Sequence, residues 1–223
     1  MSTRETSRLS LDVWTDLVSP YCYITESALE CALARFEHRH CVEVRWHTYR
    51  LQMSGREWGW TDAFMHWSSI SRQEARQSLA EIERLAAEVD LEIHFDISTP
   101  TDTYDANRLA HYATHLGRRR AAVFAMQRAM FADGKRVDDH KTLLEIASDV
   151  GLDGDGVRFV LETDVYGDQI IQDEHDGDAL GLTGLPFLRF DNGTTLTGLR
   201  SAQTLHESLK RAWIDRAPTS GRP

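Results

Sequence analysis

The sequence predicts an α/β fold in which a long helical segment interrupts a small sheet. Strand-like alternation occurs near both ends of the chain, and helical periodicity fills the middle, between about residues 52 and 156. A turn signal, Asp191-Asn192-Gly193, separates two short strand-like runs before the last helical run. The 223 residues are 41% hydrophobic and 27% charged, which is typical of one folded domain or of one domain with a large insertion.

The first elements are predicted from hydrophobic spacing. A strand is expected at Leu9–Trp14, where apolar residues alternate with serine and aspartate. A helix is expected over Tyr23–Phe36, and a second strand over Cys41–Leu51, which is rich in β-branched and aromatic residues. The segment from residue 19 to residue 22 therefore lies at a strand-to-helix turn.

The later elements follow from the same patterns and from capping residues. Gly117 and Gly151 are natural helix ends, and Asp155 is expected to cap a helix. The predicted helices are Arg72–Val89, Tyr104–Leu116, Arg119–Ala132, His140–Val150, Val157–Thr163, Tyr166–Leu180 and Ser201–Ile214, and the predicted hairpin strands are Phe187–Phe190 and Thr194–Thr197. This order is that of a thioredoxin fold over residues 1–51 and 157–223, with residues 52–156 as an inserted helical subdomain.

The turn Ser19-Pro20-Tyr21-Cys22 stands where a thioredoxin-type protein carries its redox dithiol, with serine in place of the first cysteine. Ser19 is a good N-cap, and Pro20 has the φ angle favoured at a first helical position. Cys22 then falls in the first helical turn, where the helix dipole is expected to lower the pKa of a thiol. The turn is therefore the main candidate for the functional site.

The cysteine count and the net charge indicate the compartment of the protein and the classes of partner that it does not bind. Three cysteines suit a reducing compartment better than a disulfide framework. Cys22 and Cys31 would lie about 13 Å apart along one helix, too far to bridge, whereas Cys31 and Cys41 are more often free than paired in such a compartment. The net charge of −10 argues against nucleic acid and anionic membranes as partners. A polar start, Met1–Arg8, and the lack of any run of about 20 apolar residues indicate a cytoplasmic protein.

Four segments spread over residues 9–214 carry a resemblance to a known family. They are the first strand with its Ser-Pro-Tyr-Cys-Tyr-Ile turn, Asp105–Tyr112, Met130–Gly134 leading to Asp139-His140, and Gly181–Phe187. They resemble the DsbA-like thioredoxin-fold family, most closely its FrnE-type oxidoreductases. The resemblance implies that Pro186 is a cis-proline, that Leu185 lies beside the active thiol, and that this backbone faces the substrate. It also suggests a homodimer.

The chain departs from that family at its motif, because FrnE-type members usually have Cys-Pro-Trp-Cys. With Ser19 in first position, an internal disulfide cannot cycle at this turn. Kappa-class glutathione transferases and 2-hydroxychromene-2-carboxylate isomerases, which are related, carry Ser-Pro-aromatic here, and their serine stabilises the glutathione thiolate. Those enzymes also use a Gly-Ser-Asp stretch, which is similar in position to Gly198-Leu199-Arg200. Arg200 would suit a more anionic ligand.

Three functions are consistent with these residues. The first is a monothiol oxidoreductase that forms mixed disulfides at Cys22 with small thiols or protein thiols. The second is an isomerase or transferase in which Ser19 activates glutathione or another low-molecular-weight thiol toward an electrophile. The third is a non-catalytic binding module. No tightly bound cofactor is expected in any of them.

Aromatic residues near the start of the insertion supply candidates for a substrate pocket with Pro20 and Tyr21. Trp58 and Trp60 would form its wall, although packing of the cluster Trp58, Trp60, Phe64 and Trp67 between subdomain and sheet is the plainer interpretation. His111 and His115 are spaced for a metal, but no third ligand is nearby, so no metal site is expected. His47 and Arg50 are explained by ion pairs as well as by catalysis.

Overall fold

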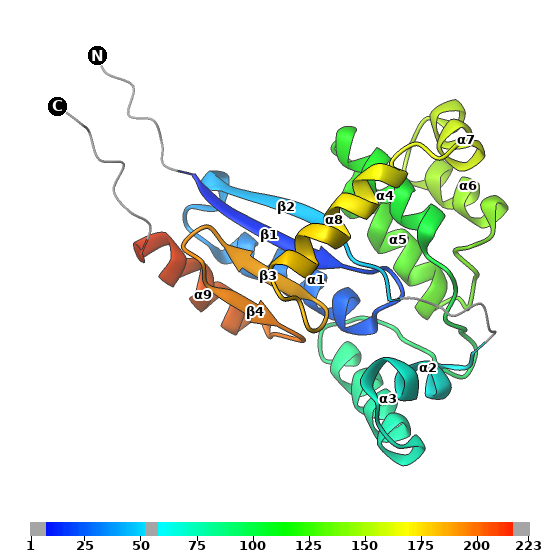
Figure 1. Ribbon diagram of the computed structural model, residues 1–223, viewed down its shortest axis with the longest axis horizontal. Helices are drawn as coiled ribbons and strands as arrows, with labels where there is room; N and C mark the ends of the chain where they lie inside the picture. Colours follow the sequence, from blue (N-terminus) through cyan, green and yellow to red (C-terminus); the bar gives the residue numbers. More distant parts are fainter. Residues whose placement is uncertain (1–7, 52–57, 216–223) are drawn as a thin grey trace.

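The computed structural model describes residues 8–51 and 58–215, so the predictions for residues 1–7 and for the junction at residue 52 lie outside it. Its sheet has the strand order β2-β1-β3-β4 (Figure 1). The strands are β1 (Leu9–Thr15), β2 (Val42–Thr48), β3 (Phe187–Phe190) and β4 (Thr195–Thr197). β2 is parallel to β1, whereas β3 is antiparallel to both β1 and β4. The α/β class and the thioredoxin-like fold are confirmed.

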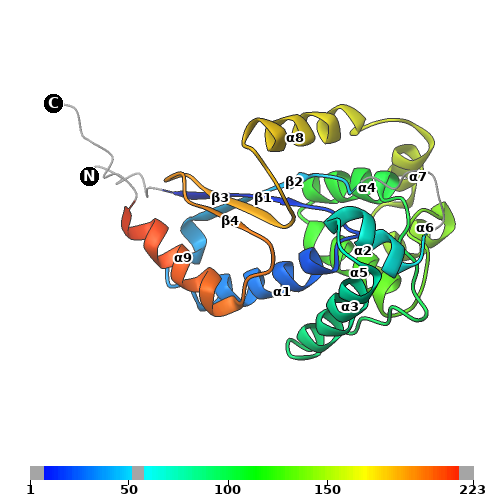
Figure 2. The same cartoon turned by 60° about the horizontal axis from the view of Figure 1, so that its bottom comes forward.

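Helices cover both faces of the sheet, as Figure 2 shows: α1 (Pro20–Arg35) and α9 (Ala202–Asp215) lie on one face and α8 (Gly167–Ala179) lies on the other. Alternation along β1 explains this arrangement, because successive side chains point to opposite faces. Leu9, Leu11 and Val13 are buried in one core cluster with residues of α1 and α9. Trp14 points the other way and donates its indole N–H to the carbonyl of Asp173 in α8, 2.9 Å away.

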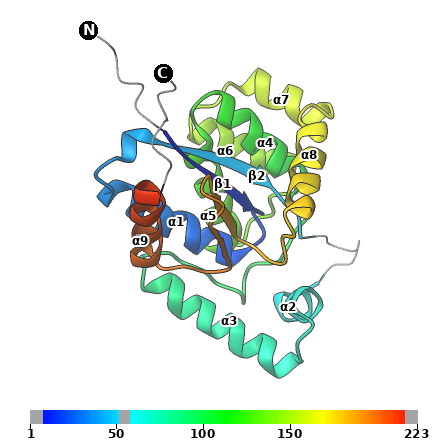
Figure 3. The same ribbon diagram turned by 60° about the vertical axis from the view of Figure 1, so that its left-hand side comes forward.

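The remaining α-helices form a bundle at one end of the sheet (Figure 2), and Figure 3 shows α2 and α3 on one side of the molecule and α4 to α7 on the other. They are α2 (Trp60–Ser68), α3 (Arg72–Ala87), α4 (Tyr104–His115), α5 (Arg119–Phe131), α6 (His140–Asp149) and α7 (Gly154–Glu162). Ser71 and Glu74 form a capping box at the start of α3, and Asp139 caps α6. Ile82, Met126 and Phe131 are fully buried in the bundle core.

Several boundaries differ from the sequence predictions by one to three residues, and those of α7 and β2 have a clear physical reason. The cap of α7 is Asp153, which accepts the Gly156 N–H at 2.8 Å, so the assignment of Asp155 was wrong. α7 packs against α4 and α6, and residue 156, the expected end of the insertion, falls inside it. β2 ends at Thr48, because after Tyr49 the backbone N–H groups of Arg50 and Leu51 bond to the carboxylates of Glu174 and Asp16 instead of to a neighbouring strand.

Candidate functional site

The predicted turn joins β1 to α1 with the expected cap. Pro20 is the first residue of α1, and the Ser19 hydroxyl oxygen accepts the Cys22 backbone N–H at 3.3 Å. The Ser19 N–H donates in turn to the carbonyl of Asp16 at 3.1 Å. Only 3% of Ser19 is exposed. These hydrogen bonds fix the start of the helix. The Ser19 hydroxyl uses its oxygen as an acceptor here, so its own proton remains a donor for another group.

Cys22 is a fully buried thiol. It lies in a small apolar cluster with Trp14, Leu185 and Phe187, and none of its surface is exposed. Burial raises the pKa of the Cys22 thiol above its usual range, and the hydrogen bond with Ser19 opposes this only in part. The direction is opposite to the one expected from its place in the first helical turn, because loss of water outweighs the helix dipole here. Cys22 therefore has the surroundings of a core residue.

The loop before β3 reaches the same place from the far end of the chain. Its Leu185–Pro186 peptide bond is cis, and Leu185 packs in the cluster that holds Cys22. The Gly198 N–H donates to the Pro186 carbonyl at 2.8 Å, which brings the segment 198–200 beside this loop. Gly198 has a φ angle of +76°, a conformation that favours glycine. Arg200 is half-buried and bonds to the Leu199 carbonyl at 2.7 Å.

A buried carboxylate under the turn, Asp16, was missed by the sequence analysis. It accepts hydrogen bonds from the Thr103 hydroxyl at 2.6 Å, the Asn107 amide at 3.0 Å and the Leu51 N–H at 2.7 Å. It is fully buried, and burial raises its pKa against the effect of these three bonds. The available signal was its position, an acidic residue immediately before the apolar pair Leu17-Val18 at the end of a strand.

The aromatic residues proposed as a pocket wall pack against different partners. Trp60 is buried in the bundle core and donates its indole N–H to the Ser98 hydroxyl at 2.9 Å, so it is a packing residue and not a pocket wall. Trp58 packs edge-on against His66, with 4.5 Å between ring centroids. Tyr21 is half-buried and its ring lies 6.1 Å from that of Phe64. Of the proposed wall, Pro20 and Tyr21 belong directly to the turn.

The histidines are engaged in ion pairs between the sheet, α4 and α8. His47 lies between Asp12, 3.0 Å away, and Asp173, 2.8 Å away, and His111 lies 3.3 Å from Asp173. Burial lowers the pKa of His47, but its hydrogen bonds with the two aspartates raise the pKa by more than burial lowers it. The net result is a raised pKa. Arg50 forms a two-point ion pair with Glu174 of α8. In the described parts of the chain, no group of three His, Cys, Asp or Glu side chains could hold a metal ion.

Comparison with known proteins gives a family that agrees with this architecture. The family model of the DSBA-like thioredoxin domain matches residues 10–210. The chain belongs to this family. A probable DsbA oxidoreductase from Streptomyces coelicolor is 29% identical, with a TM-score of 0.86 over 96% of this chain and 93% of that one. An uncharacterized protein of Bacillus subtilis, YwbO, is 26% identical over 71% of this chain and 74% of its own length.

More distant solved structures share the fold. The cytosolic disulfide reductase DsbM from Pseudomonas aeruginosa is 18% identical, with a TM-score of 0.65 over 92% of this chain and 96% of that one.

None of the helices in residues 8–51 and 58–215 is long and apolar enough to span a membrane. The cysteines Cys22, Cys31 and Cys41 are all free thiols, and only Cys31 is exposed.

Proposed function

We propose that this DsbA-like protein is a thiol-disulfide oxidoreductase whose reactive sulfur belongs to a bound low-molecular-weight thiol, glutathione or another, rather than to Cys22. The observation that carries the proposal is the contrast within the turn. Cys22 is fully buried with a raised pKa, whereas the Ser19 hydroxyl sits at the positive end of α1 with its proton available. A thiolate is therefore better stabilised beside Ser19 than at Cys22.

The proposed reaction is a thiol-disulfide exchange. Ser19 donates its hydroxyl proton in a hydrogen bond to the sulfur of the bound thiol, which favours the thiolate form. This thiolate attacks one sulfur of a disulfide that lies along the backbone of Leu185 and Pro186. The new bond joins the bound thiol to that sulfur, and the other sulfur leaves as a thiolate that takes up the proton the bound thiol lost. A second thiol molecule then attacks the bound thiol's sulfur in the mixed disulfide, so that the disulfide of the two thiol molecules forms and the substrate sulfur leaves as a thiol with the proton of the second molecule.

Arg200 is proposed to hold the anionic end of the thiol. It lies in the segment that bonds to the Pro186 carbonyl, and its guanidinium has a hydrogen bond to a single backbone carbonyl, which leaves other N–H groups for a carboxylate. DsbM, the fold neighbour above, has also been solved with GSH. Because Ser19 is only 3% exposed, binding of the thiol requires side chains over the turn to move apart.

The test compares Ser19→Ala and Cys22→Ala in a Cys31→Ala background, which removes the exposed thiol. Reduction of a small disulfide is measured as a function of glutathione concentration, and covalent adducts are measured by intact mass. We expect Ser19→Ala to lose at least about tenfold in kcat/KM, as for removal of one stabilising donor. Cys22→Ala should keep most activity, and the background protein should carry no adduct.

Three other outcomes would each support one of the alternative functions. A glutathione adduct on Cys22, with activity lost in Cys22→Ala, would establish the monothiol oxidoreductase instead. Thiol-dependent turnover of an electrophilic carbon substrate without disulfide reduction would establish an isomerase or transferase. Absence of thiol binding and of turnover, with partner binding unaffected by either substitution, would establish a binding module.

A further inference from the structure

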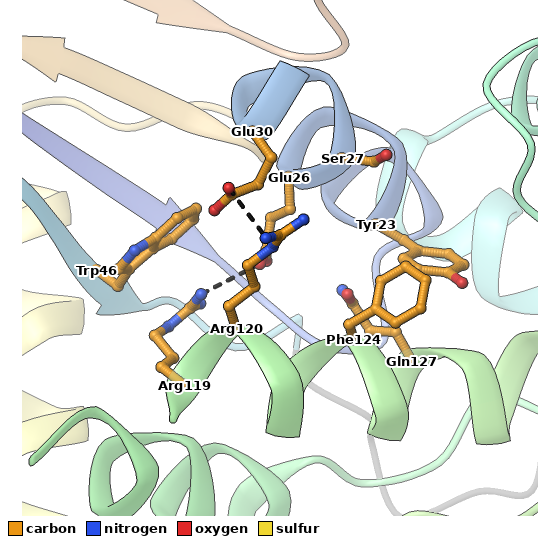
Figure 4. A pocket seen from close by; sticks show the side chains of 9 residues that line it. All are labelled: Tyr23, Glu26, Ser27, Glu30, Trp46, Arg119, Arg120, Phe124 and Gln127. Carbon is orange, nitrogen blue, oxygen red and sulfur yellow. Dashed lines mark hydrogen bonds and ion pairs between the residues drawn. The ribbon is translucent and has the colours of Figure 1, made fainter. Parts of the chain in front are cut away.

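A groove of about 70 Å³ lies between α1, α5 and β2, and it begins at Tyr23, the residue after Cys22 on α1 (Figure 4). Its aromatic walls are Tyr23, Trp46 and Phe124. Phe124 is 44% exposed, although it is a large apolar side chain, and its ring lies 5.7 Å from that of Tyr23. None of the residues proposed for the thiol site lines this groove. The groove therefore needs an explanation of its own.

The charged residues of the groove are matched in pairs. Arg119 bonds to Glu26 at 3.1 Å, and its guanidinium also lies over the ring of Trp46 at 3.9 Å. Arg120 lies 3.5 Å from Glu30 nearer the solvent. The formal charges of the two pairs sum to zero, and Arg119 is already held on two sides. This arrangement favours a neutral ligand over an anion or a cation.

Two buried polar atoms in the groove have no hydrogen-bond partner among the described residues. They are Nε2 of Gln127 and Oε1 of Glu26. Gln127 is only 1% exposed, and Figure 4 shows its amide rising from α5 toward the groove beside Phe124. Buried polar groups are nearly always paired, because leaving them unpaired is costly. Both atoms are shielded from solvent, so a ligand in the groove reaches this donor and this acceptor only when the side chains around them shift.

We propose that this groove binds a small neutral aromatic ligand with an amide-like group that both accepts and donates hydrogen bonds. Its acceptor takes the Gln127 Nε2 hydrogen, its donor bonds to Glu26 Oε1, and its ring packs on the exposed face of Phe124. The groove shares no lining residue with the proposed thiol site, although Tyr23 and Glu26 follow Cys22 along α1. The competing occupant is a single water molecule that bridges Gln127 and Glu26 without any ligand.

Benzamide is a suitable probe, with benzoate as the charged analogue of the same shape. Binding is followed by protein NMR in the wild type, Gln127→Met, Phe124→Ala and, as a matched helix-surface control, Asp149→Ala. We expect benzamide to shift resonances of α1 and α5 with a Kd of about 1 mM or tighter, and benzoate to bind at least about tenfold more weakly. Both groove variants should weaken benzamide binding at least about fivefold, and Asp149→Ala should not. Saturating glutathione should not displace the probe.

The exposed position of Phe124 keeps the test informative if the buried Gln127 variant folds poorly. Benzamide binding that is unchanged by Phe124→Ala would overturn the proposal, as would equal binding of benzoate. Absence of benzamide binding, together with a crystal structure that shows only a water between Gln127 and Glu26, would assign the groove to structural hydration.

Discussion

Two buried aspartates, Asp16 and Asp173, join parts of this molecule in the same way but with partners of different charge. Asp16 connects the end of β1 to the start of α4 and accepts only neutral donors, from Thr103, Asn107 and Leu51. Asp173 connects α8 to the sheet and to α4 through His47, His111 and the Thr48 N–H. Each carboxylate accepts several hydrogen bonds, yet their pKa values move in opposite directions.

The difference shows what offsets desolvation. Burial raises the pKa of Asp16, and its neutral hydrogen bonds do not compensate. Burial also raises the pKa of Asp173, but the bonds with His111 and His47 outweigh it, so the net direction is downward. Asp16 is also completely inaccessible, whereas Asp173 is 9% exposed. Burial with neutral partners thus raises the pKa of Asp16, whereas burial beside two histidines leaves the pKa of Asp173 lowered.

Asp16→Ala should have the largest effect on stability. The substitution leaves the Leu51 N–H and the Asn107 amide without an acceptor in the interior, and we expect the free energy of unfolding to fall by about 3 kcal/mol. Urea unfolding measures this. Asp149→Ala, on the exposed surface of α6, is the control and should change stability by less than about 0.5 kcal/mol. Equal effects of the two substitutions would show that Asp16 does not hold the turn.

Asp173→Asn should have the next largest effect. The amide keeps the shape of the side chain but loses the charge that faces His47 and His111. We expect the free energy of unfolding to fall by about 2 kcal/mol near pH 5.5, where His47 is protonated. A loss as large as that of Asp16→Ala would contradict the order inferred from burial.

The pH dependence of unfolding distinguishes the two clusters by sign. The pKa of His47 is raised above 6.5, so its contribution is complete below pH 6.5 and is lost as the pH rises through the higher folded value. The pKa of Asp173 is lowered below 3.8, so its contribution is complete above pH 3.8 and is lost as the pH falls through the lower folded value. The pKa of Asp16 is raised, so its contribution is complete below pH 3.8 and is lost as the pH rises.

Wild-type protein should therefore lose stability from the His47 cluster as the pH rises from about 5.5 to about 8, and Asp173→Asn should lose less over the same range. Urea titrations at the two pH values measure the difference. A parallel decline in wild type and variant would show that the cluster does not titrate.

Glu174→Gln should have the smallest effect. Its ion pair with Arg50 also fastens α8 to the end of β2, but both side chains retain about a quarter of their surface, at 20% and 26%. Water screens such a pair, so we expect a loss of about 0.5 kcal/mol in thermal or urea unfolding. A loss near 2 kcal/mol would show that this partly exposed ion pair contributes as much to the free energy of unfolding as the buried clusters do.

Local signals were enough for the elements and for the frame of the site. Ser19 and Pro20 predicted the start of α1, and the hairpin before residue 198 was predicted from its turn and its β-branched residues. The environment of Cys22 was not predictable in this way. Its first-turn position suggested a lowered pKa, but Leu185 and Phe187, more than 160 residues later in the chain, remove it from water.

By itself, the sequence determined the thioredoxin-like order of elements, the helical insertion and the absence of a dithiol at the turn, because these depend on periodicity, capping and residue identity. Only the tertiary structure decided in which direction the pKa values of buried groups shift and which buried polar atoms lack a hydrogen-bond partner among the described residues. Desolvation and pairing depend on distant residues, such as Asn107 for Asp16 and Asp173 for His47. The same reason leaves Nε2 of Gln127 without a hydrogen-bond partner among the described residues, in a groove that no local pattern predicted.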